Sequence, residues 1–134
     1  MLKFNELKVG DLVFAEYDGH EKEGEIIEVD GIDRKVCVLT GEGQEFWYQP
    51  KDLKPIIFDE AQLFKVGFQK HDNGDGTIKY MKGAFRVLIH TPGNFSNFEM
   101  WYREDQRHIK GPIFLHDFQN KYLAMTKIPL TKGE

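Results

Sequence analysis

Several features that would point to a secreted, membrane or disulfide-bonded protein are missing from this chain of 134 residues. Cys37 is the only cysteine, which excludes an internal disulfide and suits a reducing cytoplasm. Its place in an alternating strand predicts a buried position. No run of about 18 apolar residues occurs, so no membrane-spanning helix is predicted. The first residues lack the apolar stretch of a secretion signal, and we expect a cytoplasmic location.

The usual sequence marks of catalysis are also missing. The chain contains no Gly-x-Ser-x-Gly nucleophile motif, no phosphate-binding glycine loop and no dinucleotide fingerprint. The carboxylates of Asp52, Asp59 and Glu60 are close in sequence, but turn and helix-cap positions account for them. We therefore expect no enzyme activity and no cofactor.

Metal-ligand spacing is not evident either. The five histidines include no i, i+4 pair of the kind that binds zinc on a helix. Residues 71–78 look like a calcium loop, yet His71 and Lys82 would occupy its first and twelfth positions, where oxygen ligands are required. A hairpin turn is the better interpretation, and no metal site is predicted. His116 lies beside the apolar stripe of a helix and is expected to hydrogen-bond to a strand or helix end.

Charge is distributed unevenly along the chain. Residues 1–57 contain 7 Lys/Arg and 13 Asp/Glu, a balance of −6, whereas residues 58–134 contain 11 and 9, a balance of +2. A nucleic-acid-binding surface normally carries a dense basic stripe, and neither half has one. Nucleic acid is therefore a disfavoured partner.

Short strand-like runs separated by turn residues fill the first half. Five short strands with one helical turn before the last resemble a small SH3-like barrel of the Tudor or KOW kind. The resemblance rests on Val9 to Val13 opening the unit, on Gly24 in the second strand, and on Trp47 through Ile56 closing it. We expect residues 1–57 to form this SH3-like five-stranded barrel. Apolar alternation and Asp-Gly turns place its strands at 12–17, 24–29, 34–40, 45–48 and 54–57, with the helical turn at 49–53.

The second half, residues 58–134, predicts a linking helix and then an antiparallel meander. Asp59 can cap a short helix that Gly67 ends. Residues 104–110 read as a polar connection after the last strand. Alternation places one apolar set on a single face of the meander: Ile78, Tyr80, Phe85, Val87, Ile89, Phe98, Met100 and Tyr102. The predicted strands cover 68–71, 77–82, 85–91 and 95–103.

One long amphipathic helix is predicted near the end of the chain. Pro112 can open it, because the first-turn N–H of a helix has no partner to lose. Apolar residues at 115, 118, 122 and 125 recur at helical spacing. We expect this helix to cover the apolar face of the meander and to pack this half on the barrel. The predicted class is mainly β, of the α+β type.

Two segments resemble small proteins of Bacteroidetes genomes and of their phages. Residues 55–68, which run from Pro-Ile-Ile-Phe-Asp-Glu to Val-Gly-Phe, look like a Pro-Ile-Pro-Leu-Thr-Glu-Glu run that leads to Gly-Phe. Residues 115–126, Leu-His-Asp-Phe-Gln-Asn-Lys-Tyr-Leu-Ala-Met-Thr, are similar to the ending His-x-Leu-Gln-Asn-x-Tyr-x-Ala-Leu-Thr-Gly. The resemblance implies a bacterial host or an infected host cell, and it implies no catalytic residues. The chain departs from the pattern at Asp59, Phe118, Met125 and Lys127.

The other face of the meander places Arg86, His90, Asn97 and Trp101 together. An exposed tryptophan beside arginine and histidine can stack on an aromatic ring and bind a phosphate. We favour the alternative in which the barrel covers this face, so that Trp101 and Leu88 become interdomain core. Both alternatives stay open from the sequence.

Trp47 and Tyr48 on the barrel also have two interpretations, a ligand pocket or a filled core. We expect a non-catalytic binding protein that recognises a protein partner or a small anionic ligand near the junction of the two halves, as a monomer or a homodimer. One alternative is a phage-encoded sponge that binds an anionic nucleotide-type signal through Arg86, Arg103 or Arg107. A second is a nucleic-acid-binding accessory protein.

Overall fold

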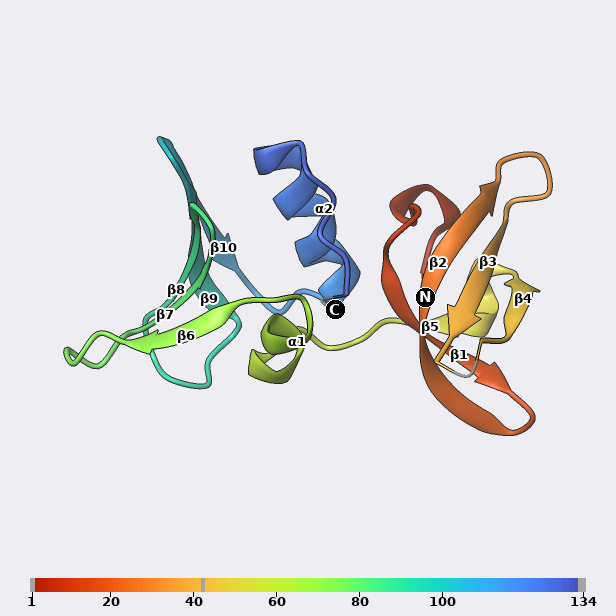
Figure 1. Ribbon diagram of the computed structural model, residues 1–134, viewed down its shortest axis with the longest axis horizontal. Helices are drawn as coiled ribbons and strands as arrows, with labels where there is room; N and C mark the ends of the chain where they lie inside the picture. Colours follow the sequence, from red (N-terminus) through yellow and green to blue (C-terminus); the bar gives the residue numbers. More distant parts are fainter. Residues whose placement is uncertain (1, 42, 133–134) are drawn as a thin grey trace.

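Two antiparallel β-sheets and one long helix make up most of the computed structural model, which describes residues 2–41 and 43–132 (Figure 1). Within these residues, the first sheet has five strands between positions 12 and 54, and the second has five between positions 69 and 110. The long helix stands between the two sheets in Figure 1. The predicted class, mainly β of the α+β type, is confirmed at this level.

The first sheet contains β1 (Leu12–Tyr17), β2 (His20–Asp30), β3 (Lys35–Thr40), β4 (Glu45–Tyr48) and β5 (Leu53–Lys54). Its order is β4-β3-β2-β1-β5, with every neighbouring pair antiparallel. A Cβ added to Gly24 would lie 2.5 Å from Cγ1 of Val38, so only glycine fits at this point of β2. β2 begins earlier than predicted, because the charged run from His20 continues the hairpin ladder with β1.

Two short 3-10 turns flank this sheet. The predicted helical turn is confirmed as η2 (Pro50–Asp52), which precedes a β5 shorter than predicted. The turn η1 (Phe4–Glu6) was not predicted; the Glu6 carboxylate closes it by accepting a hydrogen bond from the Lys3 N–H at 2.7 Å. η1 brings Glu6 to the side of the sheet that faces the long helix.

The second sheet contains β6 (Gln69–Asp72), β7 (Ile78–Lys82), β8 (Phe85–Ile89), β9 (Asn97–Tyr102) and β10 (Asp105–Lys110). Its order β10-β9-β8-β7-β6 is a simple meander. The turn between β6 and β7 is the predicted hairpin, in which Asp72 and Asp75 accept hydrogen bonds from the N–H groups of Gly74 and Thr77. These carboxylates stabilise the turn.

The prediction of a polar connection over residues 104–110 is wrong. These residues form the edge strand β10, paired with β9 from Asp105↔Tyr102 to Lys110↔Asn97. An edge strand needs backbone pairing and no apolar face, so its polar composition hid it. The turn before β10 also lacks the glycine or asparagine that usually marks a hairpin. Arg103 takes the positive φ, 57°, in its place.

The predicted alternation on the second sheet is confirmed. We call the face that carries the apolar residues of β7, β8 and β9 the inner face. All of these residues are buried except Tyr102, which is partly buried. The inner face joins one large hydrophobic cluster with residues of both helices.

The linking helix is confirmed as α1 (Glu60–Lys65). The Asp59 carboxylate accepts a hydrogen bond from the N–H of Gln62 at 3.1 Å, which caps the helix as predicted. Gly67, with φ of 95°, ends it.

The long helix α2 covers residues Leu115–Thr126. Pro112 does not open it, contrary to the prediction, because Asp117 fixes the start further on by accepting a hydrogen bond from the Phe114 N–H at 3.0 Å. The rings of Phe118 and Tyr122 lie 6.2 and 4.6 Å from that of Phe85 on the inner face. Through these ring contacts, α2 packs into the large hydrophobic cluster.

The same helix is bonded to the N-terminal half. The Gln119 side chain accepts from the Leu12 N–H and donates to the carbonyls of Gly10 and Leu130, each at 2.8 Å. Leu12 itself belongs to the large cluster, whereas a second cluster fills the first sheet around Val13 and Ile26. β1 therefore contributes to both cores. No helix among the described residues is long and apolar enough to cross a membrane.

Candidate functional site

The outward side chains of the second sheet form two rows that each cross all five strands. We call this surface the outer face. His90 and Asn97 join it through contacts with Glu99 and His108. Thus the four residues predicted to lie together do share one face. The rows are Gln69, Met81, Arg86, Trp101 and Gln106, and then His71, Lys79, Leu88, Glu99 and His108.

Trp101 is 41% exposed on the outer face, between Arg86 of β8 and Gln106 of β10. The interpretation in which the N-terminal half covers it as interdomain core is therefore wrong for this residue. The reason lies in the fold, since the inner face points toward α2 and the first sheet lies beyond that helix (Figure 1). Leu88 is partly buried beside it. The outer face is the solvent side of the sheet, with a large aromatic ring left uncovered.

A hydrogen-bonded group of polar side chains surrounds Glu99. Nε2 of His90 lies 2.8 Å from one Glu99 carboxylate oxygen, and the Gln106 amide donates to the other at 2.5 Å. Nε2 of His108 lies 2.5 Å from Oδ1 of Asn97. The single carboxylate among the described residues of this face is thus already engaged.

The remaining charges of the outer face are positive. Lys79, Arg86 and Lys110 lie on it, together with His71, His90 and His108, three of the five histidines of the chain. A cationic surface with an exposed tryptophan can bind an acidic partner through charge and ring contacts together.

The arginines proposed to hold an anionic nucleotide make contacts within the chain. Arg86 donates to the carbonyls of Gly83 and Phe85 at 2.6 and 3.1 Å. Arg107 forms two hydrogen bonds to Asp105 at 3.2 and 3.0 Å, and the Arg103 guanidinium lies over the Tyr102 ring. The three arginines do not converge on a common point through these contacts.

Trp47 and Tyr48 are separated by the alternation of β4. Tyr48 packs against the cluster of the first sheet, and its hydroxyl donates to the Glu16 carbonyl at 3.2 Å. Trp47 is 47% exposed. Tyr48 therefore packs against the core of the first sheet, whereas Trp47 is exposed and lies on the other sheet from Trp101.

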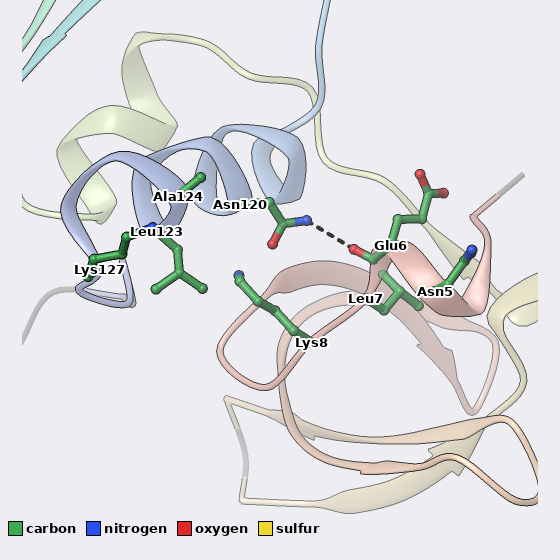
Figure 2. Close-up of a pocket in the computed structure, with 8 residues that line it drawn as sticks. All are labelled: Asn5, Glu6, Leu7, Lys8, Asn120, Leu123, Ala124 and Lys127. Carbon is green, nitrogen blue, oxygen red and sulfur yellow. Dashed lines mark hydrogen bonds between the residues drawn. The ribbon is translucent and has the colours of Figure 1, made fainter. Parts of the chain in front are cut away.

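A groove of about 460 Å³ lies at the predicted junction of the two halves, between η1 and α2 (Figure 2). In Figure 2, Asn120 points toward Glu6, and its amide donates to the Glu6 carbonyl at 3.0 Å. Lys8 enters from the η1 side and donates its backbone N–H and its ammonium to buried Asp11. Burial raises the pKa of the Asp11 carboxyl, although Lys8 opposes the shift. None of the predicted site residues lines this groove.

His116 sits beside the groove and departs from its prediction. Its side chain is 1% exposed, and neither ring nitrogen has a hydrogen-bond partner in the described part of the chain. Nε2 lies 3.5 Å from Oδ1 of Asp117, a distance without hydrogen-bond geometry. The expected bond to a strand or helix end is therefore wrong. Ligand atoms of Glu6, His116 and Asp117 all lie within 4.8 Å of one another.

Sequence reasoning could not find this group, because Glu6 and His116 are far apart in the chain and η1 was not predicted. Adjacent His116-Asp117 is a common dipeptide and carries no spacing signal for a metal. A buried histidine on the apolar side of a helix was the one available hint.

Comparison with protein-family models, with curated proteins and with solved structures found no match for this chain. Function is therefore inferred from the geometry of the outer face and of the η1–α2 junction alone.

Proposed function

We propose that the protein is a non-catalytic binding module that recognises an acidic segment of a protein partner with its outer face. The observation that carries the proposal is the exposed Trp101, flanked by Arg86 and set among lysines and histidines. Tryptophan, tyrosine and arginine are the residue types that dominate binding energy at the centre of protein interfaces. Exposed tryptophan rings of this kind are a usual feature of such interfaces.

Charge supports an acidic partner in particular. Glu99 is paired with His90 and Gln106, so it offers little repulsion to an incoming carboxylate. Arg86, the cross-strand neighbour of Trp101, is held against the carbonyls of Gly83 and Phe85, which lowers the entropy that its side chain loses on binding. The lysines at positions 79 and 110 extend the positive field to two sides of the ring.

The alternative of an anionic nucleotide sponge has less support. Arg86, Arg103 and Arg107 make separate contacts within the chain instead of lining one deep cavity. A bacterial or phage setting and a cytoplasmic location stay expectations of the sequence. Nucleic acid remains a competing ligand for a cationic face with a tryptophan, so an oligonucleotide probe belongs in the binding test.

The experiment is selection of peptides from a randomised displayed library against the purified protein, followed by affinity measurement of the selected peptides by fluorescence anisotropy. We expect peptides rich in Asp and Glu around one apolar residue. Trp101→Ala and Arg86→Gln should each weaken binding at least about tenfold, the loss of one interface anchor. Trp47→Ala is the matched control, because Trp47 is similarly exposed on the other sheet, and it should bind like the wild type.

Four results would overturn the proposal. Peptides without acidic enrichment, or Trp101→Ala binding as tightly as the wild type, would remove the outer face as the recognition surface. Tighter, salt-sensitive binding of an oligo-dT probe that Trp101→Ala abolishes would assign the face to single-stranded nucleic acid instead. A dimer in light scattering that dissociates in Trp101→Ala would identify a second copy as the occupant.

We also propose finer features of the fold. The first sheet closes into an SH3-like barrel, which is supported by contacts between β4 and β1: Tyr17 stacks on Phe46 with ring centroids 4.4 Å apart, and Tyr48 donates to Glu16. α2 acts as a cover for the inner face of the second sheet, which is supported by the ring contacts of Phe85 with Phe118 and Tyr122. We propose residues 1–57 and residues 58–134 as the two structural units of the chain.

A further inference from the structure

His116 is the buried polar side chain whose chemistry the outer face does not use. Burying an imidazole without a partner costs free energy, and buried polar groups in folded proteins are nearly always satisfied. His116 is fully enclosed at the second position of α2, yet both ring nitrogens are free of hydrogen bonds within the described residues. A bound ion or water at this place would satisfy the ring.

Two carboxylates lie at the position where that ligand would sit. One oxygen of Glu6 accepts from the Lys3 N–H, and one oxygen of Asp117 accepts from the Phe114 N–H. In each case this leaves the second oxygen of the carboxylate for another contact. The two acidic groups and the ring nitrogen are held within 4.8 Å of one another by η1 and by the first turn of α2.

A fourth donor atom lies on the same side of the helix. Asn120 is four residues after His116, which places both side chains on one face of α2. Its nitrogen donates to the Glu6 carbonyl, and this bond fixes which end of the amide is the oxygen. That oxygen, Oδ1, is buried and has no partner among the described residues. Two independent polar groups next to Glu6 are thus left unsatisfied.

We propose that Glu6, His116 and Asp117, with Oδ1 of Asn120 as a further donor, form a binding site for a divalent transition-metal ion of the zinc type. Carboxylate and amide oxygens alone would suit magnesium or calcium, whereas an imidazole ligand selects zinc-like ions. The ammonium of Lys8, which also lines the groove, is bonded to Asp11.

The ion joins the N-terminal turn η1 to α2. Glu6 comes from the first residues of the chain and the other ligands from the last helix, so binding closes a loop that spans most of the sequence. Ion binding therefore couples the two sheets through α2. This role is separate from the outer face and does not depend on the proposed function.

The test is isothermal titration of the chelator-treated, dialysed protein with ZnCl₂ and, separately, with MgCl₂. We expect one Zn²⁺ per chain and weaker binding of Mg²⁺. Glu6→Gln and Asp117→Asn should each weaken Zn²⁺ binding at least about tenfold, since loss of even an outer-shell partner of a metal ligand costs 10–100-fold. Both substitutions keep an oxygen acceptor for the backbone N–H that each carboxylate binds. His20→Gln, which removes an exposed histidine, is the matched control and should bind like the wild type.

A second measurement keeps the assignment testable if His116→Gln fails to fold. Hydrogen exchange of residues 3–8 should slow on addition of ZnCl₂ in the wild type and not in Glu6→Gln. Absence of Zn²⁺ binding to the wild type, equal affinity for Mg²⁺ and Zn²⁺, or unchanged Zn²⁺ affinity in both Glu6→Gln and Asp117→Asn would overturn the proposal.

Discussion

The side-chain oxygen of Gln119 accepts a hydrogen bond from the backbone N–H of Leu12 at 2.8 Å, across 107 residues of sequence. The amide nitrogen of the same side chain donates to the carbonyls of Gly10 and Leu130. One buried amide thus provides hydrogen-bond partners for backbone groups at the start of β1 and in the segment after α2. Leu12 also connects the same two regions through apolar packing in the large cluster.

Replacement of Gln119 by leucine should therefore be strongly destabilising. The leucine has a similar volume, but it leaves three backbone groups without a partner, and each unsatisfied buried group costs about 1–3 kcal/mol. Allowing for partial relaxation, we expect a loss of about 2–4 kcal/mol in the free energy of unfolding, measured by urea denaturation. Gln69→Leu, at an exposed edge strand, should change it by less than about 0.5 kcal/mol. A loss below about 1 kcal/mol for Gln119→Leu would contradict the structural role.

Lys127 ends α2 in the left-handed conformation with φ of 65°. This conformation costs an L-residue about 1–2 kcal/mol, whereas glycine adopts it freely but loses more entropy on folding. We expect Lys127→Gly to raise the free energy of unfolding by up to about 1 kcal/mol, detected as a higher melting temperature. Lys121→Gly, inside the same helix, is the matched control and should lower it by about 1 kcal/mol. The same sign for both substitutions would contradict this account of the helix end.

Glu60 links α1 to the second sheet through two donors. Its Oε2 accepts from the Tyr80 hydroxyl at 2.5 Å and lies 2.8 Å from the ammonium of Lys70. The bond from Lys70, and then that from Tyr80, holds the pKa of the Glu60 carboxyl below its ordinary value. Burial, and then the hydrogen bond to Glu60, raises the pKa of the Tyr80 hydroxyl.

The sign of the resulting pH dependence follows from linkage. A carboxyl whose pKa is lowered by folding contributes stability above the pKa of the unfolded chain, and the contribution is lost as pH falls through the folded value. We expect the free energy of unfolding to fall less in Glu60→Gln than in the wild type as the pH drops below about 4.5. Urea midpoints of wild type and variant, compared at pH 7 and at pH 3.5, measure this difference. Parallel pH profiles would show that the Glu60 contacts do not contribute.

How much of this molecule could be predicted depends on whether a pattern is local. The period-two alternation of β7, β8 and β9 was enough to place Arg86 and Trp101 on one face, since cross-strand neighbours follow from register. It was not enough to decide whether that face is covered, because the position of α2 relative to the sheets is set by contacts distant in sequence. The exposure of Trp101 therefore had to come from the structure.

The missed features have the same physical origin. β10 is held by backbone pairing at a sheet edge, and its polar side chains leave no periodic apolar signal. Glu6 approaches His116 only after η1 forms and α2 packs beside it, so no spacing in the sequence records their proximity. Helix α1 could be predicted because its start and end signals, Asp59 and Gly67, lie within a few residues of the helix.

The two sheets should unfold as one cooperative unit, and the chain carries a reporter in each. Trp47 lies in β4 of the first sheet and Trp101 in β9 of the second, so Trp47→Phe and Trp101→Phe leave one fluorescent reporter apiece. Because Leu12 and Gln119 tie β1 to α2 and to the large cluster, we expect coincident urea transitions from both reporters. Leu12→Ala, added to each background, should lower both midpoints equally, with a loss of about 2–5 kcal/mol. Two separate transitions, of which Leu12→Ala moves only that of Trp47, would show that the halves fold independently and that α2 does not couple them.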